Sequence, residues 1–190
     1  MMMEDKFVIP GDLIGTCEEF IAGAGTYEEK GNIFASVAGY VKINRRERVV
    51  SVLPSTNVPP VPKAGDVVVG RIIDLKNSVA LVEIARVKGK EDREIPSIAQ
   101  GAIHISNVKS SYVSELTKEF AVNDIVKAKV IDSRTMRLST ADRYLGVVKA
   151  YCSRCRASLK RRSNTYTLIC PRCERIEIRK ISEDYGLGII

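Results

Sequence analysis

Four of the five cysteines in this 190-residue chain lie close together near its end. They form two Cys-x-x-Cys pairs, Cys152 with Cys155 and Cys170 with Cys173, separated by 14 residues. Each pair places two thiolates on one tight turn, and two such turns complete a tetrahedral zinc site that leaves no position for water. The pattern therefore predicts one structural Zn²⁺ ion. Two disulfides or a redox pair are the alternative, disfavoured because reducing compartments keep thiols free.

A zinc ribbon over residues 147–190 is expected to hold these turns. Residues 165–169 and 175–181 alternate as short strands, and a segment this small needs a metal for most of its folding free energy, on the order of 10 kcal/mol. Loss of one thiolate should therefore unfold the ribbon while the preceding domain stays folded. Lys160, Arg161 and Arg162 fall at the tip of the expected hairpin. They are candidate phosphate contacts or simply solvated side chains.

The preceding residues, 61–146, contain five runs rich in Val and Ile that predict strands. These are residues 66–75, 78–87, 101–106, 124–132 and 136–140. A polar stretch, residues 107–120, separates the third run from the fourth. Five strands with one short helical excursion after the third are typical of an OB-fold barrel.

Alternation along these strands predicts which side chains point away from the core. Those expected on the outer face that such barrels offer to nucleic acid are Leu81, His104, Lys127, Lys129 and Arg137. The two lysines and the arginine either contact RNA phosphates or are ordinary solvated side chains. His104 is the only histidine of the chain, which excludes a two-histidine metal site, and it either touches a base or is a hydrogen-bonded surface residue.

The first 60 residues predict a separate, small β-sandwich or barrel. Residues 32–37, 40–43 and 48–52 are short β-rich runs between turn signals. Four of the seven prolines then fall in residues 53–63, where missing backbone donors favour a stiff, extended linker. We expect Cys17 in this domain to be a small buried hydrophobe, the usual state of a free cysteine.

The charge is unevenly distributed between these three segments. The whole chain carries +7 with a pI near 9.2, yet residues 1–60 hold 6 Lys and Arg against 8 Asp and Glu. The chain has 45% hydrophobic residues, no long apolar run and no signal-peptide pattern, so we expect a soluble cytoplasmic protein without a membrane span. The basic excess beyond residue 60 favours a polyanionic partner.

Several motifs resemble a known family. Val69-Gly-Arg-Ile72, Gly101-Ala-Ile-His-Ile-Ser106 and the run from Val122 to Val130 resemble the RNA-binding domain repeated in ribosomal protein S-one, an OB fold. Pro10-Gly-Asp-Leu-Ile-Gly15 and Gly23-Ala-Gly-Thr-Tyr27, followed by that domain and a four-cysteine ribbon, resemble the Csl-four-type cap subunit of the archaeal RNA exosome. The resemblance covers nearly the whole chain in order.

The resemblance implies a non-catalytic subunit that sits on a ring of phosphorolytic exoribonuclease subunits. In that family the amino-terminal domain docks on the ring, the S-one domain surrounds the entrance pore and guides single-stranded RNA, and the ribbon lies at the periphery. A second cap protein and a DnaG-like protein are implied as further partners. The chain departs from many S-one domains at Leu81, where an aromatic side chain often stands, so one base-stacking platform is missing.

Two other classes of function fit the sequence less well. The chain has no paired acids in a metal-binding arrangement, no Ser or Cys nucleophile beside a histidine, and no phosphate-cradling glycine loop, so we do not expect an enzyme. A free-standing translation or transcription factor that binds RNA would also suit a barrel followed by a ribbon. The acidic first segment argues against it, because it is a poor RNA binder and a plausible protein dock.

Overall fold

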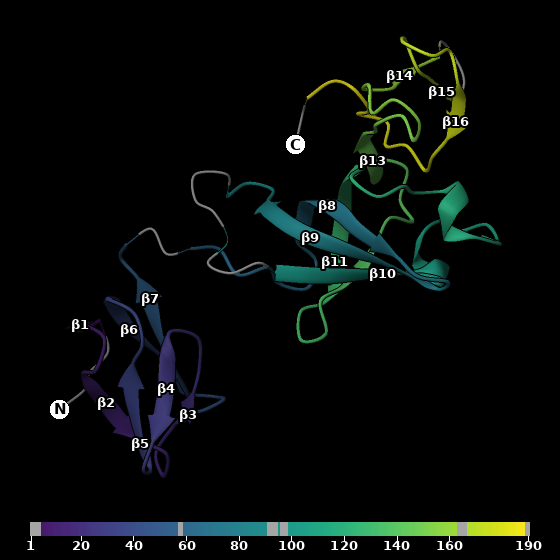
Figure 1. The fold of residues 1–190 in the computed structure, drawn as a ribbon. Helices are drawn as coiled ribbons and strands as arrows, with labels where there is room; N and C mark the ends of the chain where they lie inside the picture. Colours follow the sequence, from purple (N-terminus) through teal and green to yellow (C-terminus); the bar gives the residue numbers. More distant parts are fainter. Residues whose placement is uncertain (1–4, 57–58, 91–94, 96–98, 163–166, 189–190) are drawn as a thin grey trace. The chain divides into compact units, whose positions relative to one another are not determined.

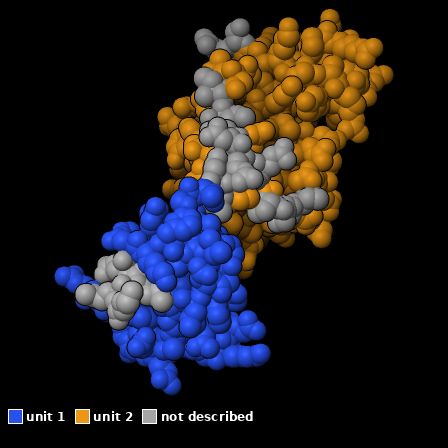
Figure 2. Space-filling view, turned by 90° about the vertical axis from the view of Figure 1, so that its left-hand side faces the viewer, with its two compact units in different colours: residues 1–58 blue, residues 59–190 orange. Residues whose placement is uncertain are grey.

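The computed structural model describes residues 5–56, 59–90, 95, 99–162 and 167–188. The chain forms two compact units, residues 1–58 and residues 59–190 (Figure 2). Strands dominate both units (Figure 1). No helix within the described ranges is long and apolar enough to cross a membrane. The prediction of a mainly β protein is confirmed. The division into segments 1–60, 61–146 and 147–190 stays a prediction.

The first unit consists of two small sheets. One has the strand order β1 (Phe7–Val8), β6 (Gly39–Asn44), β7 (Val49–Pro54) and β3 (Ile21–Ala22). The other has the order β2 (Leu13–Thr16), β5 (Asn32–Ala35) and β4 (Thr26–Glu29). Buried side chains of both sheets meet in one core, formed by Val8, Ile14, Ile33, Ala35, Val41, Val50 and Val52. The unit is thus a small β-sandwich, with every second residue of its longer strands directed into the core.

Five strands of the second unit close into a barrel. Its strands are β8 (Val67–Leu75), β9 (Val79–Val87), β10 (Ala99–His104), β11 (Ile125–Asp132) and β12 (Arg137–Ser139). The sheet runs β12-β10-β9-β8-β11, and pairing of β12 with β11 closes it. Two short 3₁₀ helices, η1 (Ile105–Asn107) and η2 (Leu116–Lys118), lie between β10 and β11. The predicted OB-type barrel is confirmed.

The barrel core follows the predicted alternation, but one residue that alternation directs outward is buried. Alternate residues of β9 and β11 are buried, among them Ala80, Val82, Ile84, Val126, Ala128 and Val130. Lys127 lies between two of these core residues, yet its side chain is only 2% exposed. The expectation that Lys127 points into solvent is therefore wrong, and the reason is a partner described below.

The last part of the chain packs against the barrel. Strand β13 (Gly146–Lys149) pairs with β11, and β14 (Lys160–Arg161), β15 (Thr167–Ile169) and β16 (Ile176–Ile178) form a separate small sheet. Buried residues near the cysteines, including Leu159, Leu168 and Ile181, belong to the same hydrophobic cluster as barrel residues such as Val126. Barrel and ribbon therefore share one core.

Candidate metal centre and nucleic-acid face

The two Cys-x-x-Cys turns have the same backbone geometry. In the first, the N–H of Cys152 donates to the carbonyl of Ala157 (2.8 Å), and the N–H of Arg156 donates back to the carbonyl of Cys152 (3.0 Å). In the second, the N–H of Cys170 donates to the carbonyl of Arg175 (2.9 Å), and the N–H of Glu174 donates back to the carbonyl of Cys170 (3.0 Å). Each turn closes on a residue of positive φ, Arg156 at 61° and Glu174 at 57°. The repeated turn orients both thiols of each pair toward the other pair.

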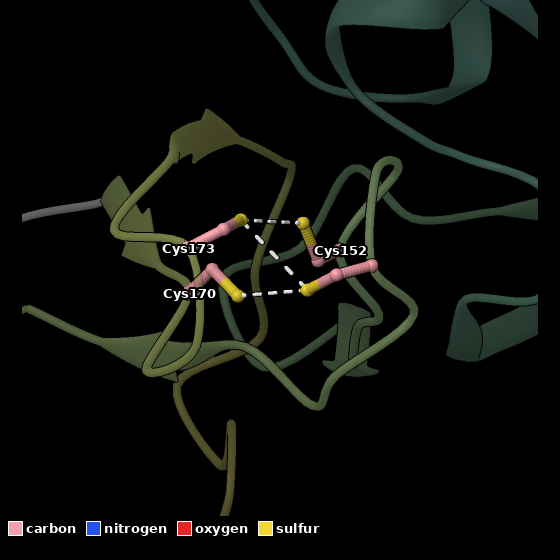
Figure 3. Close-up of side chains that lie close together, drawn as sticks. Cys152, Cys170 and Cys173 are labelled. Carbon is pink, nitrogen blue, oxygen red and sulfur yellow. Dashed lines mark hydrogen bonds between the residues drawn. The ribbon is translucent and has the colours of Figure 1, made fainter.

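The four sulfur atoms form a compact cluster. Their Sγ atoms all lie within 4.8 Å of one another. Separations are 3.6 Å for Cys152–Cys173, 3.4 Å for Cys155–Cys170 and 3.7 Å for Cys155–Cys173 (Figure 3). Thiolates at about 2.3 Å from a tetrahedral Zn²⁺ ion would stand about 3.8 Å apart, whereas a disulfide requires about 2.05 Å. The donor set therefore fits a four-coordinate metal ion.

The electrostatics of the cluster also favour a cation. Burial opposes ionisation of Cys170, but the N–H groups of Cys173 and Arg172 point at its sulfur and bring its pKa down to about 6. The N–H of Arg175 lowers the pKa of Cys173, yet its proximity to Cys170 and the other cysteines raises that pKa to about 12. Four thiolates this close repel one another, and a bound cation removes that repulsion.

A buried polar network ties the first cysteine turn to the barrel. Glu177 of β16 accepts hydrogen bonds from the backbone N–H and the hydroxyl of Ser153, both at 2.9 Å. Arg179 then bridges two carboxylates, donating to Glu177 at 2.6 Å and to Asp124, next to β11, at 2.9 Å. Burial works to raise the pKa of Glu177, but the bonds from Ser153 and Arg179 hold it below its usual value. Hydrogen bonds and ion pairs through Glu177 and Arg179 thus connect the first cysteine turn to Asp124 beside the barrel.

All five residues predicted for the outer RNA-binding face alternate with core residues along their strands, but Lys127 is buried. Ala102 in the middle of β10 pairs with Leu81 of β9 on one side and with Arg137 of β12 on the other. Leu81 is half-buried, whereas His104, two residues beyond Ala102, and Arg137 are exposed. Leu81, His104 and Arg137 therefore lie on one side of three neighbouring strands.

The remaining cations lie in different surroundings. Lys129 is exposed on β11, next to Ser139 of β12. Lys127 forms an ion pair with Asp184, which lies after β16. It is occupied by that carboxylate and is not available to RNA. Lys127 therefore does not belong to the outer face.

The basic residues of the ribbon are exposed. Lys160 and Arg161 make up β14, and Arg162 follows them. Residues 163–166, which complete the expected hairpin tip, lie outside the described residues. The role of these cations as phosphate contacts stays a prediction.

In the first unit, each sheet carries a row of large side chains on its outer face, which sequence reasoning missed. Phe7, Tyr40 and Leu53 pair directly across β1, β6 and β7, and the two rings meet edge to face at 5.4 Å. We call this row the first apolar ladder. Leu13, Phe34 and Tyr27 pair across β2, β5 and β4, with rings stacked at 5.6 Å, and form the second apolar ladder. Because the inner faces meet in the core, the ladders lie on opposite sides of the sandwich.

The sequence contains the apolar residues of both ladders, but it does not show which of them are neighbours on paired strands. An apolar residue on the polar face of a single strand is unremarkable, since isolated exposed hydrophobic residues are normal. Only the register shows that six of them line up in two rows. The expectation of a buried Cys17 is wrong, because this residue lies exposed in the turn after β2 and not in the core.

Comparison with known proteins gives consistent matches. Residues 61–143 match the family described as exosome component EXOSC1/CSL4, and residues 7–44 match the exosome complex exonuclease RRP4 N-terminal region. The chain is 45% identical over 183 residues to the exosome complex component Csl4 of Archaeoglobus fulgidus, covering 96% of this chain and 98% of that protein.

More distant relatives have related names. The CSL4 component of Mus musculus is 32% identical over 155 residues, 77% of this chain and 78% of that protein. The Rrp4 component of Methanobrevibacter smithii is 33% identical over 131 residues, 68% of this chain but only 39% of that protein.

Proposed function

The chain belongs to the Csl4 family of exosome components, and on this premise we propose that it is a non-catalytic, RNA-binding cap subunit acting in the cytoplasm. The proposed role is to dock on a ring of exoribonuclease subunits and to guide single-stranded RNA to the pore for 3′-to-5′ degradation or processing. The observation that carries this proposal is that the exposed apolar rows and the exposed cations of the outer face belong to different units of the chain. Apolar ladders stand on the acidic first unit, and the exposed cations of the outer face stand on the basic second unit.

The apolar ladders are the proposed protein-docking surfaces. Tyr40 and Leu53 are 46% and 60% exposed, and Leu13 and Tyr27 are 51% and 40% exposed. Rows of aromatic and aliphatic side chains of this kind are typical of the centre of protein interfaces, where charged residues are depleted. Two opposite rows would let the small sandwich contact two partner surfaces. A second cap protein and a DnaG-like protein are proposed as further partners of the complex.

The outer face of the barrel is the proposed RNA path. Arg137 and Lys129 are exposed cations on neighbouring strands, and His104 lies on the same side as Arg137. Cations spaced along strands can hold successive phosphates without reading sequence. Leu81 provides only an aliphatic surface at its position, so we propose weak binding without strong base preference. The four cysteines are proposed to hold one structural Zn²⁺ ion and to take no part in chemistry.

The proposal is tested by reconstitution with a purified exoribonuclease ring. The full chain should comigrate with the ring in size-exclusion chromatography and increase capture and decay of a tailed RNA, without degrading RNA alone. The double variant Tyr40→Ala/Leu53→Ala should lose assembly. Ile178→Ala is the matched control, because Ile178 is an apolar residue of the second unit with the same 60% exposure as Leu53.

A fragment of residues 59–190 provides the second arm, because that unit has its own core. It should bind RNA but not the ring. If the fragment assembles as tightly as the full chain, the docking assignment is wrong. The free-standing RNA-binding factor then becomes the better reading.

A further inference from the structure

Tyr112 is the most exposed large apolar or aromatic side chain among the described residues, at 90%. It lies in the irregular segment between η1 and η2, so no strand or helix explains its orientation. The segment is nevertheless anchored to the barrel core at two points. Val108 and Val113 on either side of it are 0% and 8% exposed and belong to the barrel core. A short span between two buried anchors thus presents an aromatic ring to solvent.

Tyr112 is one of the residues that line a surface cavity of about 280 Å³. The polar part of its wall consists of Ser106, Ser110, Ser111 and Lys109, and Ile105 and Val113 provide apolar contact. Serine hydroxyls both donate and accept hydrogen bonds. The cavity therefore combines an aromatic surface with several adaptable polar groups, which is the combination that unpaired nucleobases require.

The cavity adjoins the proposed RNA path. The Ser106 hydroxyl lies 2.8 Å from Nδ1 of His104, the exposed residue at the end of β10. On the other side of η1, the carbonyl of Asn107 accepts a hydrogen bond of 3.1 Å from the hydroxyl of Ser139, two residues after Arg137. Helix η1 thus links the cavity to both proposed contacts.

The charge of the site favours a base over a phosphate. Among the described residues that line the cavity, Lys109 is the one cation, and it is ion-paired with Glu119. The remaining polar groups are neutral hydroxyls. A phosphate in this cavity would gain little, whereas a stacked base needs no cation.

We propose that this cavity is a nucleobase-binding subsite, in which an unpaired base of single-stranded RNA stacks on Tyr112 while the serine hydroxyls contact its polar edge. The subsite supplies the stacking platform that Leu81 does not provide. The inference rests on the proposed RNA-binding function of the barrel. Because hydroxyls adapt to donors and acceptors alike, the subsite accepts purines and pyrimidines.

The test is titration of the full chain with fluorescently labelled 12-nucleotide oligo(A) and oligo(U) at several salt concentrations. Tyr112→Ala should weaken binding of both roughly 5- to 150-fold, the range that loss of one stacked base corresponds to. The slope of log affinity against log salt should stay unchanged, because a stacking residue releases no counterions. Tyr112→Phe keeps the ring and should bind almost as well as the parent chain.

Tyr144→Ala is the matched control, since Tyr144 is another exposed tyrosine of the second unit, and it should leave the affinity unchanged. Tyr112→Ala with the affinity of the parent chain overturns the subsite while the RNA-binding function stands. A lower salt slope in Tyr112→Ala also overturns it, because the residue would then act through phosphate contacts. No binding of either oligonucleotide by the parent chain at low salt overturns the RNA-binding function, and the subsite with it.

Discussion

Lys127 of barrel strand β11 forms an ion pair with Asp184, which lies 57 residues further along the chain, after β16. The Lys127 side chain is 2% exposed and that of Asp184 is 31% exposed. Removing an ammonium group from water costs free energy unless a carboxylate compensates for the lost hydration. The ion pair therefore links the segment after β16 to the barrel strand β11.

The first prediction concerns the two halves of this pair. Asp184→Asn leaves a buried ammonium group without a partner and should lower the free energy of unfolding by about 3 kcal/mol. Lys127→Met removes the buried charge, keeps most of the volume and leaves a carboxylate that water can reach, so it should cost about 1 kcal/mol or less. Urea unfolding of both variants measures the difference. Equal losses would show that the desolvated charge is not what matters.

The second prediction concerns the metal centre. Cys170→Ser should abolish stoichiometric zinc in elemental analysis, whereas Cys17→Ser, the exposed cysteine of the first unit, should keep one ion per chain. Because Cys170 belongs to the core shared with the barrel, we now expect the substitution to lower barrel stability as well as to unfold the ribbon. Native protein without zinc would refute the assignment of the ion.

The third prediction separates the exposed and buried lysines of β11. Each phosphate contact on a single strand contributes about −0.7 to the slope of log affinity against log salt. Lys129→Ala and Arg137→Ala should each flatten the slope by about that amount in RNA titrations. Lys127→Met should leave the slope unchanged, because Lys127 is already paired with Asp184. A slope unaffected by the Lys129 and Arg137 changes would mean that this face is merely solvated.

The fourth prediction is a pH dependence of stability. Tyr185 donates a hydrogen bond to the carbonyl of Leu159 (2.9 Å), and burial raises its pKa to about 12. Since an unfolded tyrosine ionises near pH 10, the folded state holds its proton more tightly. The resulting stabilisation is complete below about pH 10 and should disappear as the pH rises to 12.

The corresponding measurement compares the parent chain with Tyr185→Phe in urea at pH 9 and at pH 12. The advantage of the parent chain should shrink by about 2 kcal/mol over this interval. Titration of the tyrosine absorbance should show one fewer late-ionising group in the variant. An advantage that is constant with pH would exclude the perturbed ionisation.

Much of this architecture could be predicted from local pattern, because local pattern determines it. The two-residue gap between Cys152 and Cys155 is a property of one turn, and the burial of Val126 and Val130 follows from the two-residue period of a strand. The position of Lys127 could not be derived in this way. Alternation directs it outward, but the residue that covers it, Asp184, is distant in sequence.

The apolar ladders and Tyr112 were missed for related reasons. Phe7, Tyr40 and Leu53 form a row only once three strands are paired in register. Tyr112 belongs to an irregular segment, where no periodicity states which side chains are exposed. Its exposure follows from the burial of Val108 and Val113, which depends on the closed barrel.

The single core that barrel and ribbon share has a kinetic consequence. Leu168 next to the cysteines and Val126 in the barrel are both fully buried in it, so we expect the opening that exposes one to expose the other. Their amide protons should exchange with deuterium through one common opening event, at rates that slow together when metal is bound. The sandwich of the first unit has its own core, and its amides should exchange independently of metal. The chain would then show two protection classes, divided at the proline-rich segment and not at the start of the ribbon.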